Sequence, residues 1–273
     1  MICLTADLHH MSLKTGNQRH SDKTEMSLAI EFVKMMEERD IKGSFFITGR
    51  SFEEEWDEVK PIVESKNIEV GGHNYEAFKP EIIHRIWNKL TNNYNGPYAY
   101  QYYDTKKTID TIYYKTGKRI NIWRNHMYMH GPNTEKILSS LGIDVCSDGV
   151  KKENFLPIED VAGVYNMPIN IIPDHEHIIH AERTPKWIEE WKNRYNWSDD
   201  FGSDSYKIEE WAKMVIDQLK ENEEEDKLSV LIIHPITMYL SDKFKSVKNI
   251  LDYIATRESV FMGDLIDKEK EAV

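Results

Sequence analysis

The sequence predicts an α/β protein whose strands form a closed or nearly closed barrel. Short apolar runs alternate with longer stretches of helical period along the chain, which is typical of βα units that build a mostly parallel sheet. At least six such units follow one another without a clear break, so we expect a single domain over residues 1–273. No G-x-G-x-x-G follows the first strand, which argues against an open dinucleotide-binding sheet.

The predicted strands are short and rich in Val, Ile and Phe. They are ICLTA, which ends at Asp7, GSFFITG at 43–49, EVGG, which leads to His73, INIW at 120–123, IDVCS at 143–147, GVYNMPI at 163–169 and LSVLIIH at 228–234. Amphipathic helices are predicted at 27–39, 80–90, 104–116, 133–141, 205–220 and 243–256.

Residues 170–205 do not follow this alternation. The segment is polar and rich in His, acidic residues and Trp, and loops of this length are uncommon unless they are functional. We expect it to form a cap over the barrel mouth with one short helix near 185–195. Trp187 and Trp191 in that helix could stack on a sugar face, or they could pack the cap on the barrel, and both interpretations stay open here.

The composition excludes several classes of function. The formal net charge of −12 disfavours nucleic acid and anionic membrane surfaces as partners, because both are polyanions. No apolar run approaches the roughly 20 residues of a membrane-spanning helix, and the N-terminal MICLTADLHH lacks the basic start of a signal peptide. Cys3 and Cys146 lie in apolar, strand-like contexts and are expected to be free thiols. We expect a cytoplasmic protein.

Chemically active side chains follow the predicted strands, where the reacting groups of α/β barrels lie. The first strand ends in Asp7, His9 and His10, and later strands lead to His73, Arg124, Asn125, His126, Asp148 and His234. One such residue alone is most often structural. Their coincidence on one rim predicts an acid–base apparatus, with a metal ion as its partner.

Five motifs together resemble the polysaccharide deacetylases related to chitooligosaccharide deacetylases. LTAD at 4–7 resembles the family's Thr-Phe-Asp-Asp strand end, and KGSFFITG at 42–49 its Ala-Thr-Phe-Phe-Val-Thr-Gly strand. IEVGGHNY at 68–75 is similar to the Glu-Ile-Gly-Asn-His-Thr-Tyr turn, IWRNHMY at 122–128 to the Phe-Arg-Pro-Pro-Tyr segment, and VLIIHP at 230–235 to the final strand with its catalytic His. The FFITG strand and the GGHNY turn are the most specific of the five.

The resemblance implies a distorted (β/α)7-type barrel that hydrolyses a carbon–nitrogen bond, typically the N-acetyl group of an amino sugar, with a divalent metal such as zinc. Position by position it implies Asp7 as general base, Arg124 as the cation that keeps this carboxylate ionised, and His234 as general acid. His73 matches a metal ligand and Asp148 a supporting carboxylate. Substrate contacts are expected from Asn125, His126, Tyr128 and Trp187.

Two of the family's metal ligands are replaced here. The second Asp of the first motif is Leu8, and the second His of the turn is Ala77, although a catalytic zinc usually keeps three protein ligands. Residues 7 and 9 of an extended segment share a face, so His9 is the first replacement, with His10 beside it. We expect the set to be His9, His73 and one cap histidine, His175 or His177, supported by Asp174 or Glu176, with His126 as a further option.

Other functions stay open at this point. A metal-independent amidase or cyclic-amide hydrolase of the same fold would use the histidines to hold substrate and water. A non-catalytic, carbohydrate-binding descendant is the other alternative. The joint presence of Asp7, Arg124 and His234 favours an enzyme, because a binding protein needs no carboxylate–Arg pair beside a strand-end His. The expected ligand is a small molecule or an oligosaccharide.

Overall fold

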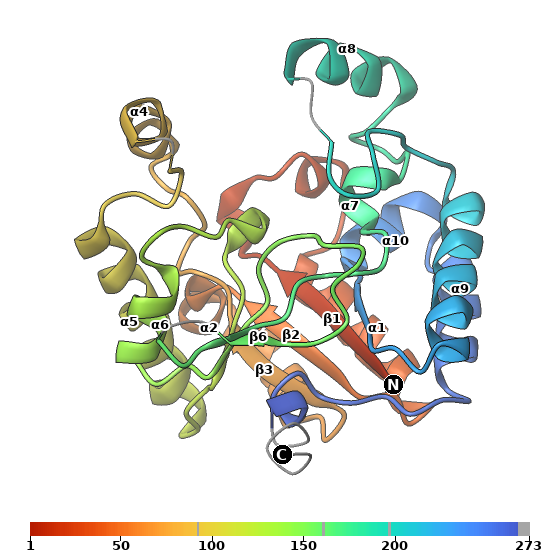
Figure 1. Cartoon of the computed structure of the whole chain (residues 1–273), viewed down its shortest axis with the longest axis horizontal. Coiled ribbons are helices and arrows are strands. Elements are labelled where there is room, and N and C mark those ends of the chain that lie inside the picture. The colour runs from red at the N-terminus through yellow and green to blue at the C-terminus, as the bar shows by residue number, and fades with distance from the viewer. Residues whose placement is uncertain (92, 160–161, 196–197, 267–273) are drawn as a thin grey trace.

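The computed structural model describes residues 1–91, 93–159, 162–195 and 198–266, and it confirms an α/β barrel. Its strands are β1 (Ile2–Leu8), β2 (Gly43–Ile47), β3 (Ile68–Gly72), β4 (Ile122–Trp123), β5 (Val145–Cys146), β6 (Ile158–Glu159), β7 (Tyr165–Asn166) and β8 (Ser229–Ile232). They form one curved sheet in the order β6-β7-β5-β4-β3-β2-β1-β8 (Figure 1). All neighbours are parallel except β6 and β7, which are antiparallel.

An irregular stretch after β7 nearly closes the barrel. The backbone N–H groups of Asn170 and Ile171 donate to the carbonyl oxygen of Val230 in β8, at 3.2 and 3.3 Å. The Asn170 side chain accepts from the Val230 N–H at 2.7 Å. These bonds satisfy backbone groups of the edge strand without a regular ladder, so the barrel is distorted as the family resemblance implied.

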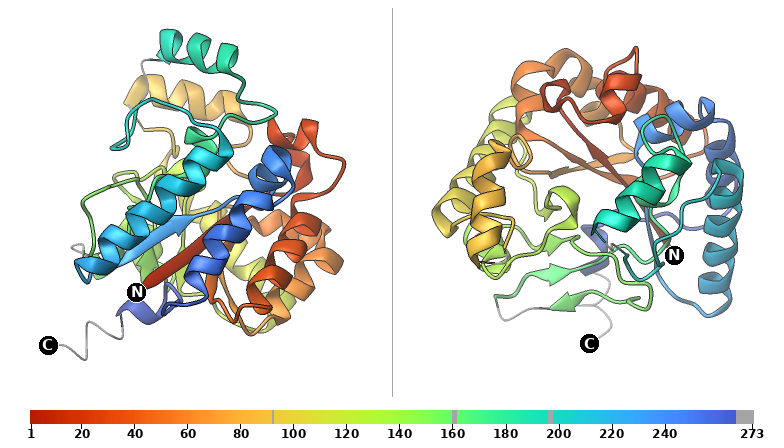
Figure 2. Two further views of the ribbon diagram at one scale, coloured as in Figure 1. Left: turned by 90° about the vertical axis from the view of Figure 1, so that its right-hand side faces the viewer. Right: turned by 90° about the horizontal axis from the view of Figure 1, so that it is seen from above.

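Helices cover the outside of the sheet (Figure 2). They are α1 (Glu25–Glu37), α2 (Gly49–Glu54), α3 (Trp56–Glu64), α4 (Glu81–Thr91), α5 (Tyr98–Thr116), α6 (Thr134–Ser140), α7 (Asp174–His177), α8 (Pro185–Tyr195), α9 (Ile208–Glu224), α10 (Pro235–Asp242) and α11 (Lys245–Ile254), with 3-10 turns η1 (Met11–Leu13), η2 (Asn17–His20) and η3 (His126–Tyr128). None of the helices in the described ranges is long and apolar enough to span a membrane.

The predicted helices differ from these mainly at their boundaries. Helix α5 begins at Tyr98, six residues before the predicted start at 104, because Pro97 precedes it in an extended conformation that suits a helix N-terminus. The Tyr-rich stretch at 98–103, which lies outside the predicted helices, is therefore helical. Helix α8 has the predicted bounds. Cys3 and Cys146 are buried free thiols, as expected.

The alternation of β1 separates two cores and explains one departure from the family motif. Leu4, Ala6 and Leu8 pack outwards in the larger core between sheet and helices. Cys3 packs with Phe46 and Val230 in a smaller core inside the barrel. Asp7 lies on the inward side of the same strand, because successive side chains alternate. Leu8 is fully buried among apolar side chains and offers no ligand atom.

Candidate active site

The carboxyl end of β1 supplies Asp7 and His9, which are both buried. His9 is held from behind by Glu25, in the first turn of α1. The Glu25 carboxylate accepts from the His9 backbone N–H at 2.9 Å and lies 3.1 Å from His9 Nδ1. Thr24 caps α1 by accepting from the Ser27 N–H, which fixes the turn that carries Glu25.

His73 follows two glycines that let β3 approach its neighbours closely. A Cβ on Gly72 would lie only 2.3 Å from the Trp123 ring, so no larger residue fits there without a shift of the sheet. The His73 N–H donates to the Ile47 carbonyl at 3.2 Å, and Nδ1 lies 2.9 Å from the Arg124 carbonyl oxygen. Both contacts direct Nε2 of the fully buried ring towards His9.

His126 comes from the 3-10 turn η3, directly after β4. Its backbone N–H donates to Asn74 Oδ1 at 2.8 Å, which ties η3 to the turn that follows β3. Met127 and Tyr128 adopt positive φ values of 57° and 55°, so the chain turns sharply here. The Phe78 ring lies 5.5 Å from the His126 ring, and Ala77 contributes no polar atom at this place.

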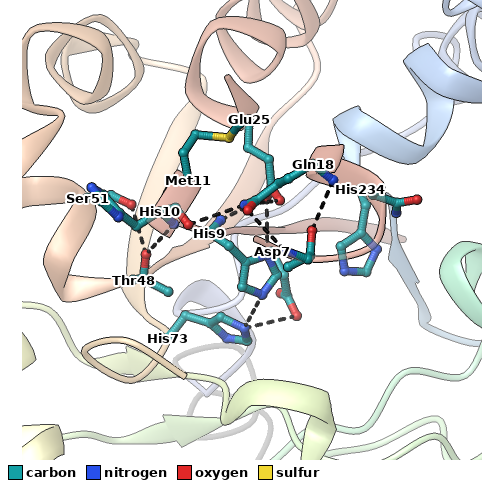
Figure 3. A network of polar contacts seen from close by, with 12 residues as sticks. Asp7, His9, His10, Met11, Gln18, Glu25, Thr48, Ser51, His73 and His234 are labelled. Atoms are coloured by element: carbon teal, nitrogen blue, oxygen red, sulfur yellow. Dashed lines mark hydrogen bonds and ion pairs between the residues drawn. The ribbon is translucent and has the colours of Figure 1, made fainter. Parts of the chain in front are cut away.

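Three imidazole nitrogens converge on one point. His9 Nε2 lies 3.2 Å from His73 Nε2 and 3.1 Å from His126 Nδ1, and the last two atoms are 3.4 Å apart. Figure 3 shows His9 between Glu25 and His73, with Asp7 beside them. A cap histidine is the first expectation from the sequence for the third position of this group, but the structure brings His126 there.

The contacts around the group leave lone pairs facing one another. The Arg124 carbonyl only accepts, so His73 Nδ1 carries the proton and Nε2 is unprotonated in the neutral ring. The Glu25 carboxylate selects the same tautomer of neutral His9. Burial lowers the pKa of His73 to about 4, which keeps that ring neutral. Either a proton or a metal ion between His9 Nε2 and His73 Nε2, which lie 3.2 Å apart, removes the repulsion between these lone pairs.

The group has the dimensions of a tetrahedral zinc site. With Zn–N bonds of about 2.0–2.1 Å, tetrahedral ligand nitrogens lie roughly 3.3–3.4 Å apart, close to the three spacings of 3.1–3.4 Å between His9, His73 and His126. The second nitrogens of His9 and His73 contact a carboxylate and a carbonyl, the usual outer partners of ligating histidines. The residues present therefore fit a divalent metal of this kind.

Asp7 forms a buried ion pair beside the histidines. Its Oδ1 accepts from Arg124 Nη1 at 2.9 Å, and its Oδ2 lies 3.8 Å from His73 Nε2. Burial alone would raise the pKa of Asp7, but Arg124 and then the neighbouring histidines outweigh it, and the pKa is lowered. Asp7 is therefore ionised at neutral pH and able to accept a proton.

His234 faces the same space from the end of β8. Its backbone N–H and its Nδ1 both contact the Asp174 carboxylate, at 2.6 and 2.7 Å. Burial lowers the pKa of His234, but the charge and hydrogen bond of Asp174 more than compensate and raise it to about 9. His234 is therefore protonated at neutral pH, with Nε2 as its second proton carrier.

A cavity of about 220 Å³ connects these groups. Its lining includes Asp7, His9, His126, His234 and Tyr128. Burial raises the pKa of the Tyr128 phenol well above its usual range, so it stays a neutral hydroxyl. A carboxylate, three ligand-type nitrogens and a protonated imidazole thus meet in one small space.

Asn125 and Asp148 lie next to the cavity and bind each other. The Asp148 carboxylate accepts from the Asn125 backbone N–H at 2.8 Å and from its Nδ2 at 2.6 Å. The Asn125 Oδ1 accepts from Trp123 Nε1 at 2.9 Å. These bonds fix the chain between Arg124 and His126, and they engage the Asn125 amide that was expected to bind substrate.

The remaining predicted residues are spread over four places. His10 accepts from the Ser12 N–H and lies 3.2 Å from Glu54, away from the three-histidine group. His177 faces Asp199 and the Asp204 carbonyl, whereas His175 lines the cavity. The short helix α7 separates these two rings, which would share a face only in an extended chain. Trp187 stacks on Trp191 at 5.9 Å within α8.

A second group of potential ligands, His130, Cys146 and Asp148, is already hydrogen-bonded. His130 Nδ1 lies 3.1 Å from Asp148, and its Nε2 contacts Glu135. Burial lowers the pKa of His130, but the two carboxylates outweigh this effect and raise it to about 9. The group is a charge-paired contact that joins His130, two residues after η3, to the chain at the end of β5 and to α6.

This pairing predicts a pH-dependent stability. Because the folded pKa of His130 exceeds the unfolded value, its contribution is complete below about pH 6.5 and disappears as the pH rises through about 9. We expect His130→Gln to lower the free energy of unfolding by on the order of 1 kcal/mol at pH 6 and by nothing measurable at pH 10. Urea denaturation at both pH values measures this, and an equal loss at both would contradict the ion pairing.

Sequence reasoning missed Glu25 and placed Asp174 only as an accessory. Glu25 reads as an ordinary acidic residue in the first turn of an amphipathic helix, where such residues favour the helix dipole. Its burial, 2 % exposed, follows only from the packing of α1 against β1. Asp174 and His234 are sixty residues apart in the sequence, so no local sequence pattern could predict their contact.

The comparisons with known proteins agree with this architecture. Residues 22–146 match the family model described as polysaccharide deacetylase, a segment that begins just before α1 and ends with β5. No curated protein matches the sequence significantly. The match covers less than half of the 273-residue chain. Over this segment the chain is similar to polysaccharide deacetylases, as its sequence indicated.

Solved structures share the fold at low sequence identity. A Mycobacterium smegmatis protein assigned to the polysaccharide deacetylases has a TM-score of 0.68 and 12% identity, over 95% of this chain and 86% of that one. The PuuE allantoinase has a TM-score of 0.65 and 13% identity, with the same coverage. A CE4 family pseudoenzyme from Bacillus anthracis has a TM-score of 0.51 and 14% identity, over 97% and 64% of the two chains. Activity must therefore be argued from the site.

Proposed function

We propose that this protein is a metal-dependent hydrolase of a non-peptide carbon–nitrogen bond, which removes the acetyl group from a small N-acetylated sugar or a related amide. The observation that carries the proposal is the convergence of His9, His73 and His126 beside an ionised carboxylate and a protonated imidazole. These two groups are Asp7, whose pKa is lowered, and His234, whose pKa is raised. A non-catalytic descendant would have no use for a buried carboxylate and a protonated imidazole on the same cavity.

The three histidines are the proposed ligands of one divalent ion, with zinc as the first candidate and a fourth coordination position left open. A bound ion of this kind would polarise an amide carbonyl and lower the pKa of a water molecule. The spacings of 3.1–3.4 Å among three imidazole nitrogens, which suit tetrahedral zinc ligands, favour this assignment over a metal-independent amidase. His10 and His177, which contact other partners, are not part of the proposed set.

The protein's own groups divide the proton transfers between them. Asp7, kept ionised by Arg124, takes a proton from the attacking water as its oxygen bonds to the amide carbon. His234, kept protonated by Asp174, donates its Nε2 proton to the amide nitrogen as the carbon–nitrogen bond breaks. The products are a carboxylic acid and a free amine. Asp148 has a positioning role, because it holds the backbone between Arg124 and His126.

The cap and the domain organisation form part of the same proposal. We infer one domain in which residues 170–205 cover the barrel mouth. Their contribution to the cavity, through His175, Glu176 and Glu182, supports this interpretation. Figure 1 shows α7 and α8 on the side of the sheet where β1 ends. Trp187 stacks within this cap and does not line the cavity, so a direct sugar contact by Trp187 is not part of the proposal.

Metal content tests the proposal directly. We expect about one equivalent of a divalent transition metal in untagged protein by plasma mass spectrometry, and none in His73→Ala or His126→Ala, because two remaining imidazoles hold such an ion much less tightly. His20→Ala is the matched control, since His20 is exposed. A wild type that stays metal-free after incubation with zinc, iron, cobalt or nickel would refute the proposed site.

A further inference from the structure

The cavity has a second wall that the proposed chemistry does not use. Besides the groups of the proposed chemistry, the cavity is lined by Asn17 from η2, by His175 and Glu176 from α7, and by Glu182. Glu182 lies so close to Gly16 that a Cβ at that position would overlap its carboxylate, at 1.6 Å. Gly16 therefore lets the cap contact the loop that carries Asn17. We call Asn17 and Glu176 the acceptor wall.

Both residues of the acceptor wall have a buried oxygen without a hydrogen-bond partner among the described residues. Asn17 is 3% exposed, and its Nδ2 bonds to Thr237 Oγ1 and contacts His175 Nδ1, both at 3.2 Å. Its Oδ1 has no partner within that part of the chain, and neither has Oε2 of Glu176. A buried acceptor left unpaired destabilises the fold, so two of them on residues that line one cavity indicate a ligand that donates hydrogen bonds.

The charges around the cavity indicate what the ligand lacks. The carboxylates of Asp7, Glu25, Glu176 and Glu182 all line it, and within the described ranges no Lys or Arg is among its lining residues. Arg124 lies behind Asp7 and is fully buried. Arg183 is engaged with the Glu176 carbonyl oxygen at 2.6 Å. His234, the protonated side chain that also lines the cavity, is already paired with Asp174 at 2.7 Å. A phosphate or carboxylate placed against the acceptor wall would therefore meet like charges and no Lys or Arg among the described lining residues.

The size of the cavity limits the ligand further. Its volume of about 220 Å³ is below the roughly 300–1,000 Å³ of pockets that hold drug-sized molecules. Met127 and Ile236 supply apolar surface among the polar groups. These dimensions suit a molecule of about one sugar unit better than several units of a polymer.

We propose that the acceptor wall of Asn17 and Glu176 selects an uncharged, hydroxyl-bearing substrate of about one sugar unit and rejects its phosphorylated or carboxylated analogues. The hydroxyl groups donate to Asn17 Oδ1 and to the Glu176 carboxylate, while the amide lies towards Asp7 and His234. This inference rests on the proposed function, which supplies the amide bond that is cleaved. It concerns binding by residues outside the proposed metal set.

Calorimetric titration of the full-length protein with N-acetylglucosamine and with its 6-phosphate tests the inference. We expect wild type to bind the neutral sugar at least tenfold more tightly than the phosphate, because the wall repels the anion. Glu176→Gln should weaken binding of the neutral sugar about tenfold, since the variant loses a charged acceptor. The Kd of the 6-phosphate divided by the Kd of the neutral sugar should also become smaller than in wild type. Asn17→Ser should weaken the neutral sugar severalfold without changing the charge.

Glu189→Gln is the control, because Glu189 is exposed on α8 and lies outside the cavity. Unchanged affinities in Glu176→Gln and Asn17→Ser, equal binding of both ligands to wild type, or no binding of the neutral sugar would each overturn the inference. If one of the two variants does not fold, the other variant still tests the inference. The ratio of the wild-type affinities for the neutral sugar and its 6-phosphate tests it as well. A metal-free protein that still shows the expected binding pattern would refute the proposed function while this inference stands.

Discussion

Asp7→Asn is expected to lower kcat for amide hydrolysis by about 10²–10⁴-fold, the usual contribution of a positioned general base. Asn has the size of Asp and can still accept from Arg124 Nη1, which now lies 2.9 Å from Asp7 Oδ1. It cannot take a proton from water. Steady-state rates of acetate release from an N-acetylated sugar measure the loss, with metal content determined on the same sample because Asp7 lies close to His73.

The fold should survive this change, although with reduced stability. Arg124 keeps its bonds to Thr5 Oγ1 at 3.0 Å and to the Ser147 carbonyl and hydroxyl oxygens at 2.8 and 2.7 Å. Its buried charge nevertheless loses its counter-ion, which is costly for a fully buried guanidinium. Thermal unfolding should therefore show a lower Tm with a cooperative transition. Asp57→Asn on the exposed face of α3 is the matched control, and a kcat of Asp7→Asn within threefold of it would remove Asp7 as the base.

The strand-end residues could be predicted because they depend on simple geometry. Carboxyl ends of neighbouring parallel strands meet at one edge of a sheet, so Asp7, His73, Arg124 and His234 had to lie near one another once their strands were recognised. The same alternation put His9 on the side of Asp7 and Leu8 in the outer core. Short apolar runs with clear polar ends were sufficient for this part of the site.

The third member of the histidine group depended on geometry that a sequence pattern does not encode. His126 is held near His9 by the bond from its backbone N–H to Asn74 Oδ1, and the chain then turns through two residues with positive φ, neither of them Gly or Asn. Such conformations cost energy and are selected by the surrounding contacts rather than by local propensity. Residues 174–177 posed the reverse problem: alternating histidines suggested an extended segment, but they form a helical turn that directs His177 away from the cavity.

His234→Ala is expected to lower kcat/KM by about 10²–10⁴-fold on amides whose amine is a poor leaving group, because these need a proton on nitrogen as the bond breaks. Activated esters release a stable anion without that proton, so their hydrolysis should fall much less. Parallel assays on an N-acetyl sugar and on 4-nitrophenyl acetate measure the difference. His20→Ala provides the control for a histidine removed from the surface, and equal losses on both substrates would argue against a general-acid role for His234.

Asp174→Asn separates this role from a merely structural one through the pH profile. Asp174 raises the pKa of His234 to about 9 against the lowering effect of burial, so the acid form should support wild-type turnover up to about pH 9 and be lost above it. Without the Asp174 charge the pKa of His234 falls, and the alkaline limb of kcat/KM should move to lower pH, while the substituted amide can still accept one hydrogen bond. A profile lowered uniformly, with its alkaline limb unmoved, would mean that Asp174 only holds the end of β8 in place.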